Sequence, residues 1–295
     1  MSTAAPPCVA EVPPVIPPVF LAGTEAHGLH AAAGEYRLWL AIPQVPPPPG
    51  GFPVLTLLDA NASFATVTEI ARQGAVRAGA TGIGATVVAG IAYPGEAPYH
   101  RARRGLDYTP GPPAEETVAH ASGGRDAFLA LLRGPVAELV AARCPVDTTR
   151  QVLAGHSLAG FFTLDVLAHD PDAFTDYIAI SPSIWWDQPR LLAGLRQARQ
   201  PARAPRVAIG VGEWEQGLTP WEAGAPEAAR TAERRGRRAM VDNARAMAER
   251  IASTNAEVSF RVYPEENHGS VLPVAISRAL RFVLGQGGGA SAPGV

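Results

Sequence analysis

The stretch QVLAGHSLAGFFTLDVLAHD, residues 151–170, sets a single serine among small residues. Residues 151–154 form a short apolar run typical of a buried strand, and apolar residues recur with a helical period from Leu158 onward. A strand that turns abruptly into a helix at a serine is the arrangement of a nucleophile elbow, in which the strained turn lifts the hydroxyl clear of the backbone. The pattern therefore makes Ser157 a candidate nucleophile at the carboxyl end of a strand.

Apolar runs and helical patterns alternate along the rest of the chain. Strands are predicted at residues 35–42, 53–59, 85–92, 151–154, 176–181, 206–212 and 257–263. Helices are predicted at residues 64–78, 123–142, 158–168, 188–198, 232–252 and 271–284. Several strands are almost entirely apolar, as expected when helices cover both faces of a sheet. The pattern predicts an α/β fold built on one mainly parallel, doubly wound sheet flanked by helices.

Proline and glycine mark the two ends of the expected folded part. Residues 1–19 read as a Pro-rich N-terminal tail, and residues 285–295 as a flexible C-terminal tail. We expect residues 20–284 to form a single domain, with loop insertions near residues 93–122 and 213–232.

The composition excludes some classes of partner and site. Lysine and arginine together number 25 against 27 acidic residues, so neither nucleic acid nor an anionic membrane surface is expected as a partner. With no apolar run of membrane-spanning length and no recognisable secretory signal, we expect a cytoplasmic location, with the periplasm as the alternative. Cys8 and Cys144 lack a CxxC or histidine context, so no disulfide, metal or cofactor is expected. The oligomeric state is left open.

Two further strands end in residues that can complete a catalytic group. Functional residues of open α/β sheets gather at the carboxyl ends of strands. Glu213 and Glu215 follow the strand at 206–212, and His268 follows the strand at 257–263. Serine, acid and histidine thus appear in the chain order that serine hydrolases with this kind of sheet use.

Each residue type suits its expected role. A serine hydroxyl needs a base to take its proton as it attacks a carbonyl, and histidine, with an ordinary pKa of about 6.5, suits that task. A carboxylate fixes the histidine tautomer. The oxyanion needs backbone N–H donors, for which we expect Leu158 together with Asn61 or Ala62.

Each of these residues also has an ordinary explanation when taken alone. A serine in a glycine-rich turn occurs by chance, His268 can be a loop residue bonded to backbone, and both glutamates can be solvated. Their joint order at the ends of the right strands favours the catalytic interpretation.

Six short stretches together resemble the esterase branch of the α/β-hydrolase family, and most closely its siderophore esterases, which cleave trilactones of the enterobactin and salmochelin type. The stretches are LLDANASF (57–64), RRGLDYTP (103–110), GHSLAGFF (155–162), ISPSIWWD (180–187), GVGEWEQ (210–216) and ENHGSVLP (266–273). The resemblance runs from about residue 20 to residue 284. It implies the α/β-hydrolase fold, with Ser157 as nucleophile and His268 as base.

The resemblance also bears on the acid. The G-x-x-E spacing from Gly212 favours Glu215, with Glu213 as the alternative. Ala159 stands where these relatives usually have glycine, which adds only a methyl group beside the elbow.

Other residues of these stretches are expected to contact substrate. The resemblance aligns Arg104 with the arginine of an R-x-x-D-Y-T-P motif, where it would meet an anionic or catecholate group; the alternative is a local ion pair with Asp107. Of Trp185 and Trp186, one is expected in the core and the other as a wall that stacks on an aromatic substrate. The arginines of residues 234–238 are expected on an exposed helix, or else one reaches the site and attracts an anionic substrate or ferric complex.

The sequence thus predicts a serine esterase that hydrolyses a small-molecule ester, the trilactone of a catecholate siderophore with or without iron, through an acyl-enzyme. A general carboxylesterase or acyltransferase, and a thioesterase of the S-formylglutathione type, are alternatives with the same triad. A non-catalytic binding module is the last alternative, and it would be expected to have lost a triad residue.

Overall fold

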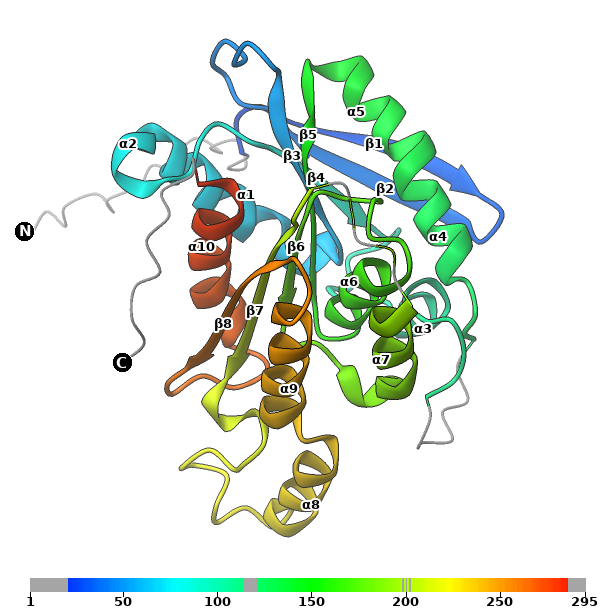
Figure 1. Ribbon diagram of the computed structural model, residues 1–295, viewed down its shortest axis with the longest axis vertical. Coiled ribbons are helices and arrows are strands. Elements are labelled where there is room, and N and C mark those ends of the chain that lie inside the picture. Colours follow the sequence, from blue (N-terminus) through cyan, green and yellow to red (C-terminus); the bar gives the residue numbers. More distant parts are fainter. Residues whose placement is uncertain (1–20, 114–120, 198, 200, 202, 286–295) are drawn as a thin grey trace, which may run out of the picture.

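The computed structural model describes residues 21–113, 121–197, 199, 201 and 203–285. The tail expected at 1–19, residues 286–295 of the other tail and residues 114–120 of an expected insertion lie outside the described residues, as does Cys8. Figure 1 shows a central sheet with helices on both sides.

The described residues contain one sheet of eight strands in the order β1-β2-β4-β3-β5-β6-β7-β8. The strands are β1 (Thr24–Ala31), β2 (Gly34–Ala41), β3 (Phe52–Leu57), β4 (Val87–Ala92), β5 (Val146–His156), β6 (Asp176–Ile180), β7 (Arg206–Gly212) and β8 (Glu257–Tyr263). β2 runs antiparallel to β1 and β4, and all other neighbours are parallel. The prediction of a mainly parallel sheet is confirmed.

The helices form two layers. They are α1 (Ala60–Val76), α2 (Ala78–Thr81), α3 (Arg101–Tyr108), α4 (Arg125–Leu131), α5 (Ala137–Arg143), α6 (Leu158–His169), α7 (Gln188–Gln197), α8 (Ala228–Arg238), α9 (Met240–Ala252) and α10 (Val271–Leu284). Figure 1 shows α1 and α10 on one side of the sheet and α4 to α7 on the other. Each layer packs on one face of the sheet and forms an apolar core with it, so the middle strands β3 and β4 are buried on both faces.

Three predictions about elements were wrong in detail. The edge strand β1 was missed, since its half-buried sequence TEAHGLHA carries polar residues and a glycine in place of an apolar run. The helix expected at 232–252 is divided, because Ala239 adopts a left-handed φ of 42° between α8 and α9. The helix expected at 123–142 is interrupted by a π-helical turn, Leu132–Val136, which contains Pro135.

The carboxyl ends of three neighbouring strands carry backbone strain. Asp59, Ser157 and Ser181 follow β3, β5 and β6, and each has a positive φ, of 53°, 62° and 47°. Residues other than glycine rarely adopt this conformation, and those that do cluster at functional sites. In the described part of the chain, no helix is long and apolar enough to cross a membrane.

Candidate active site

The turn at Ser157 has the geometry of an elbow. Ser157 has φ 62° and ψ −120°, its N–H donates to the carbonyl of Ile180 at 2.9 Å, and its own carbonyl accepts the N–H of Phe161 at 3.0 Å. A Cβ atom at Gly155 would lie 2.3 Å from the carbonyl oxygen of Ala159, so the turn closes only with glycine there. The glycine before His156 is therefore required by the tightness of the turn.

The structure brings Ser157, His268 and Glu215 together from the ends of three strands. His268 Nε2 lies 2.9 Å from Ser157 Oγ, and His268 Nδ1 lies 2.7 Å from Glu215 Oε2. Since an ionised carboxylate only accepts hydrogen bonds, Nδ1 carries the proton and Nε2 is free to accept one from serine. This is the arrangement in which a histidine removes a serine proton.

The two candidate acids lie in different surroundings. Glu215 is buried, and its Oε1 accepts hydrogen bonds from Ser181 Oγ at 2.5 Å and from the N–H of Gly212 at 2.6 Å. Glu213 is instead exposed, and its Oε2 accepts the N–H of Glu265 at 2.9 Å. Geometry therefore favours Glu215.

The expected oxyanion donors differ in availability. Leu158 is the first residue of α6 and Asn61 lies in the first turn of α1, where backbone N–H groups have no partner within the helix. The N–H of Ala62 donates to the carbonyl of Asp59 at 3.0 Å, so it is already used. The Asn61 side chain ties this helix to the end of β4 through bonds of 2.8 and 3.0 Å to the backbone of Tyr93.

Arg104 is bonded to Asp59, and the expected alternative of a local pair with Asp107 is wrong. Its Nε lies 3.0 Å from both carboxylate oxygens of Asp59, while Asp107 lies 3.7 Å from Arg103. Tyr108 also donates to Asp59, at 3.0 Å. Burial raises the pKa of Asp59, and the charge of Arg104 opposes that effect.

The two tryptophans divide as expected into one core residue and one partly exposed residue. Trp186 is buried and donates from Nε1 to the carbonyl of Gly111 at 3.1 Å. Trp185 is half-buried, and the guanidinium of Arg238 stacks 4.0 Å above its ring. Nearby in the chain, Ser183 Oγ lies 3.4 Å from Ser157 Oγ, so this segment borders the candidate nucleophile.

Comparison with known proteins identifies the family. A family model described as "Putative esterase" matches residues 30–271, which is most of the chain. The chain belongs to this esterase family. Because its relatives are named esterases, the protein is a carboxylic ester hydrolase.

Individual esterases align over most of their length. The chain is 34% identical over 268 residues to the ferri-bacillibactin esterase BesA of Bacillus subtilis, and the alignment covers 84% of each protein. It is 34% identical over 244 residues to a siderophore triacetylfusarinine C esterase of Aspergillus fumigatus, covering 78% of this chain and 81% of the relative. The solved structure of the siderophore hydrolase EstA from Aspergillus nidulans matches with a TM-score of 0.79 and 26% identity, over 92% of this chain and 98% of that one.

Sequence reasoning gave no role to His156, which precedes the candidate nucleophile of this esterase. His156 Nε2 lies 3.0 Å from the carbonyl oxygen of His268, and the two rings are 4.7 Å apart. Burial, together with the nearby His268 and Arg104, lowers the pKa of His156 to about 3, so the ring is neutral. A carbonyl only accepts, so His156 Nε2 is the donor that holds the backbone at His268.

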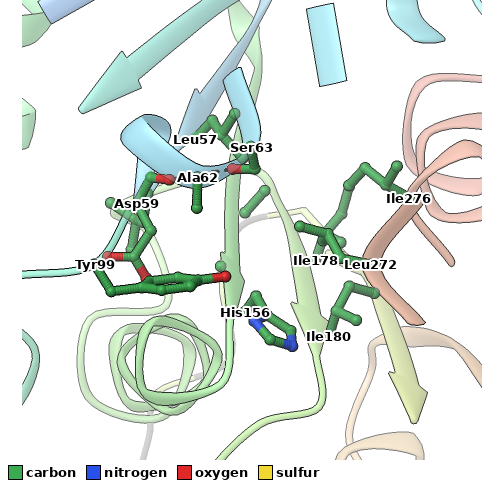
Figure 2. Close-up of a pocket in the computed structure, with 13 residues that line it drawn as sticks. Leu57, Asp59, Ala62, Ser63, Tyr99, His156, Ile178, Ile180, Leu272 and Ile276 are labelled. Atoms are coloured by element: carbon green, nitrogen blue, oxygen red, sulfur yellow. Dashed lines mark hydrogen bonds between the residues drawn. The ribbon is translucent and has the colours of Figure 1, made fainter. Parts of the chain in front are cut away.

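A small cavity of about 10 Å³ lies beside His156, with room for about one water molecule. Figure 2 shows Asp59, Ala62 and Tyr99 on one side of it and Ile178, Ile180 and Leu272 on the other.

Across the described residues, no three histidine, cysteine or acidic side chains gather as metal ligands.

Proposed function

We propose that the protein hydrolyses the backbone esters of a siderophore trilactone, with Ser157 as nucleophile, His268 as base and Glu215 as acid. The observation that carries the proposal is the continuous chain of contacts, 2.9 Å from Ser157 Oγ to His268 Nε2 and 2.7 Å from His268 Nδ1 to Glu215 Oε2. The names of both relatives, which specify siderophore esters, support the substrate class.

Acylation follows from the two hydrogen bonds. As Ser157 Oγ attacks the ester carbonyl, its proton passes to His268 Nε2, and Glu215 stabilises the imidazolium that forms. The negative oxygen of the tetrahedral intermediate is held by the backbone N–H groups of Leu158 and Asn61. When the intermediate collapses, His268 returns the proton to the leaving alkoxide, which leaves an acyl group on Ser157.

Deacylation repeats the same steps with water. His268 removes a proton from a water molecule as that water attacks the acyl carbonyl, and then gives the proton to Ser157 Oγ. The products are a free carboxylic acid and the regenerated serine. No step uses a cofactor, and any ferric ion belongs to the substrate.

Of the two arginines that stack on aromatic rings, Arg238 is the better candidate for an anionic or catecholate substrate. The guanidinium of Arg238 lies 4.0 Å from the ring centre of Trp185, whereas Arg104 stacks on Tyr99 and its charge is already paired with the buried Asp59. Guanidinium groups keep their charge and bind planar oxygen-bearing groups with forked hydrogen bonds.

The nucleophile is tested by covalent labelling. A fluorophosphonate is expected to modify Ser157 alone, as read by peptide mass mapping, and the Ser157→Ala variant is expected to stay unlabelled. Ser183, whose hydroxyl is 3.4 Å away, is the matched site that must remain unmodified. Labelling at Ser183 in place of Ser157 would overturn the assignment.

The substrate class is tested by comparing kcat/KM for a metal-free catecholate trilactone and for p-nitrophenyl butyrate. We expect the trilactone value to be higher by at least tenfold. A higher kcat/KM for the simple ester would favour a general carboxylesterase. S-formylglutathione is measured as a third substrate, and a kcat/KM above that of the trilactone would favour a thioesterase.

A further inference from the structure

Ser181 lies directly after β6 and takes no part in the steps described above. Its side chain is fully buried, and its N–H donates to the carbonyl of Gly210 in the neighbouring strand β7 at 2.7 Å. The backbone of Ser181 is left-handed, with φ 47°, a conformation that glycine adopts without strain and serine does not. Because the backbone conformation favours glycine, we infer that the serine side chain has a role of its own.

The side chain of Ser181 reaches the acid of the triad. Its Oγ lies 2.5 Å from Glu215 Oε1, and the same oxygen accepts the N–H of Gly212 at 2.6 Å. The other oxygen, Oε2, lies 2.7 Å from His268 Nδ1. The three donors thus divide between the two oxygens of one ionised carboxylate, which is a pure acceptor.

A glutamate needs this restraint more than an aspartate would. Its side chain has one more rotatable bond, so the carboxylate can turn away from the histidine unless another contact fixes it. Gly212 fixes Oε1 from the backbone on which Glu215 itself sits, three residues away. Ser181 adds a second donor to the same oxygen, from the end of the adjacent strand, so Oε1 is held from two directions while Oε2 meets His268 Nδ1.

We propose that Ser181 is a positioning residue: its hydroxyl holds Glu215 Oε1 so that Oε2 faces His268 Nδ1. The inference rests on the proposed triad and extends it to the first serine of the SPS sequence at 181–183. In this role Ser181 acts through Glu215.

Two substitutions separate the hydroxyl from the backbone conformation. Ser181→Ala keeps the Cβ atom and the left-handed strain, whereas Ser181→Gly relieves the strain, and both remove the hydroxyl. We expect both variants to lose about 10- to 100-fold in kcat for p-nitrophenyl butyrate with little change in KM, as for the loss of a hydrogen bond to a charged group. A role in backbone conformation alone would instead leave Ser181→Gly as active as the wild type.

A double-mutant cycle tests whether the effect passes through Glu215. In a Glu215→Gln background, Ser181→Ala is expected to lower kcat by less than about threefold, because the acid that it positions is already lost. Independent, multiplicative losses in the double variant would overturn the inference.

The same cycle distinguishes failure of the inference from failure of the triad. If Glu215→Gln is strongly impaired while both Ser181 variants are fully active, only the role of Ser181 is wrong. If Glu215→Gln is itself fully active, the assignment of the acid is wrong and the role of Ser181 falls with it. Thermal unfolding of each variant shows whether a loss of rate comes from a loss of folded protein.

Discussion

Glu213 and Glu215 lie two residues apart after β7, yet only Glu215 faces His268. The short 3₁₀ turn Glu213–Glu215 points one side chain inward and leaves the other bonded to the loop at Glu265. A single turn of backbone therefore decides which carboxylate lies against His268 Nδ1.

The pair provides a matched test at the residue scale. Glu215→Gln is expected to lower kcat by about 10²- to 10⁴-fold, because the amide that replaces the carboxylate cannot hold the histidine tautomer. Glu213→Gln, with an exposed side chain, is expected to change kcat by less than about threefold. Steady-state kinetics on p-nitrophenyl butyrate gives both values, and the reverse ranking would make Glu213 the acid.

His156 gives a prediction for stability against pH. Its pKa is lowered to about 3 in the folded protein, against about 6.5 in an unfolded chain. Between these values the unfolded state binds the extra proton, so the free energy of unfolding falls as pH falls. The neutral His156 therefore leaves the free energy of unfolding at its full value above pH 6.5, and that free energy falls progressively as the pH is lowered towards 3.

The His156→Gln variant removes this dependence. From pH 6.5 to pH 5 the wild type is expected to lose about 1 to 2 kcal/mol more unfolding free energy than the variant, since most carboxylates stay ionised in that range. Urea unfolding at the two pH values measures the difference. Equal losses in both proteins would show that His156 titrates normally in the folded state.

At the scale of elements, α8 lies beyond the end of the sheet and has several arginines in its last turn. Figure 1 shows α8 projecting beyond the carboxyl end of β7. The left-handed residue Ala239 then turns the chain back into α9. Arg238, at the end of α8, reaches Trp185, while Arg237 pairs with Glu233 on the exposed face. Neighbouring arginines of one helix thus have different surroundings.

This difference predicts a split in substrate dependence. Arg238→Ala is expected to raise KM for an anionic ferric siderophore by about 3- to 30-fold, as for the loss of a cation near a charged ligand, and to leave the KM of neutral p-nitrophenyl butyrate unchanged. Arg237→Ala is the control and is expected to match the wild type with both substrates. An equal effect of the two variants would mean that Arg238 acts only through the general charge of α8.

At the scale of the whole molecule, a buried ion network joins three helices on one side of the sheet. Asp165 of α6 is fully buried and lies 2.6 Å from Arg125 at the start of α4 and 2.7 Å from Arg190 of α7. Removing one partner of such a network leaves the remaining charges buried and uncompensated.

Asp165→Ala is therefore expected to lower the free energy of unfolding by about 3 to 5 kcal/mol. Asp172→Ala, which breaks the exposed pair with Arg199, is the control and is expected to cost less than about 1 kcal/mol. Urea unfolding of the three proteins gives the comparison. A similar loss of unfolding free energy in both variants would show that the network adds little to the stability of the protein.

The order of strand ends made the sheet and the candidates Ser157 and His268 predictable, because that information lies along the chain. The contacts of Ser181, His156 and Arg104, which join residues 34 to 112 apart, could not be predicted, because side-chain packing, and no strand-end pattern, determines them. The edge strand β1 was missed for a different reason: its half-buried face leaves no apolar run, and pairing with β2 defines it. Local pattern thus identified where chemistry can occur, and tertiary packing decides how its residues are held.

The esterase activity at Ser157 is tested most directly by incubating the purified protein with a metal-free catecholate trilactone, followed by chromatography with mass detection. We expect a linear product heavier than the trilactone by one water molecule, formed by the wild type and absent with Ser157→Ala. Product formation that persists in Ser157→Ala, or an intact trilactone beside rapid hydrolysis of p-nitrophenyl butyrate, would contradict this expectation.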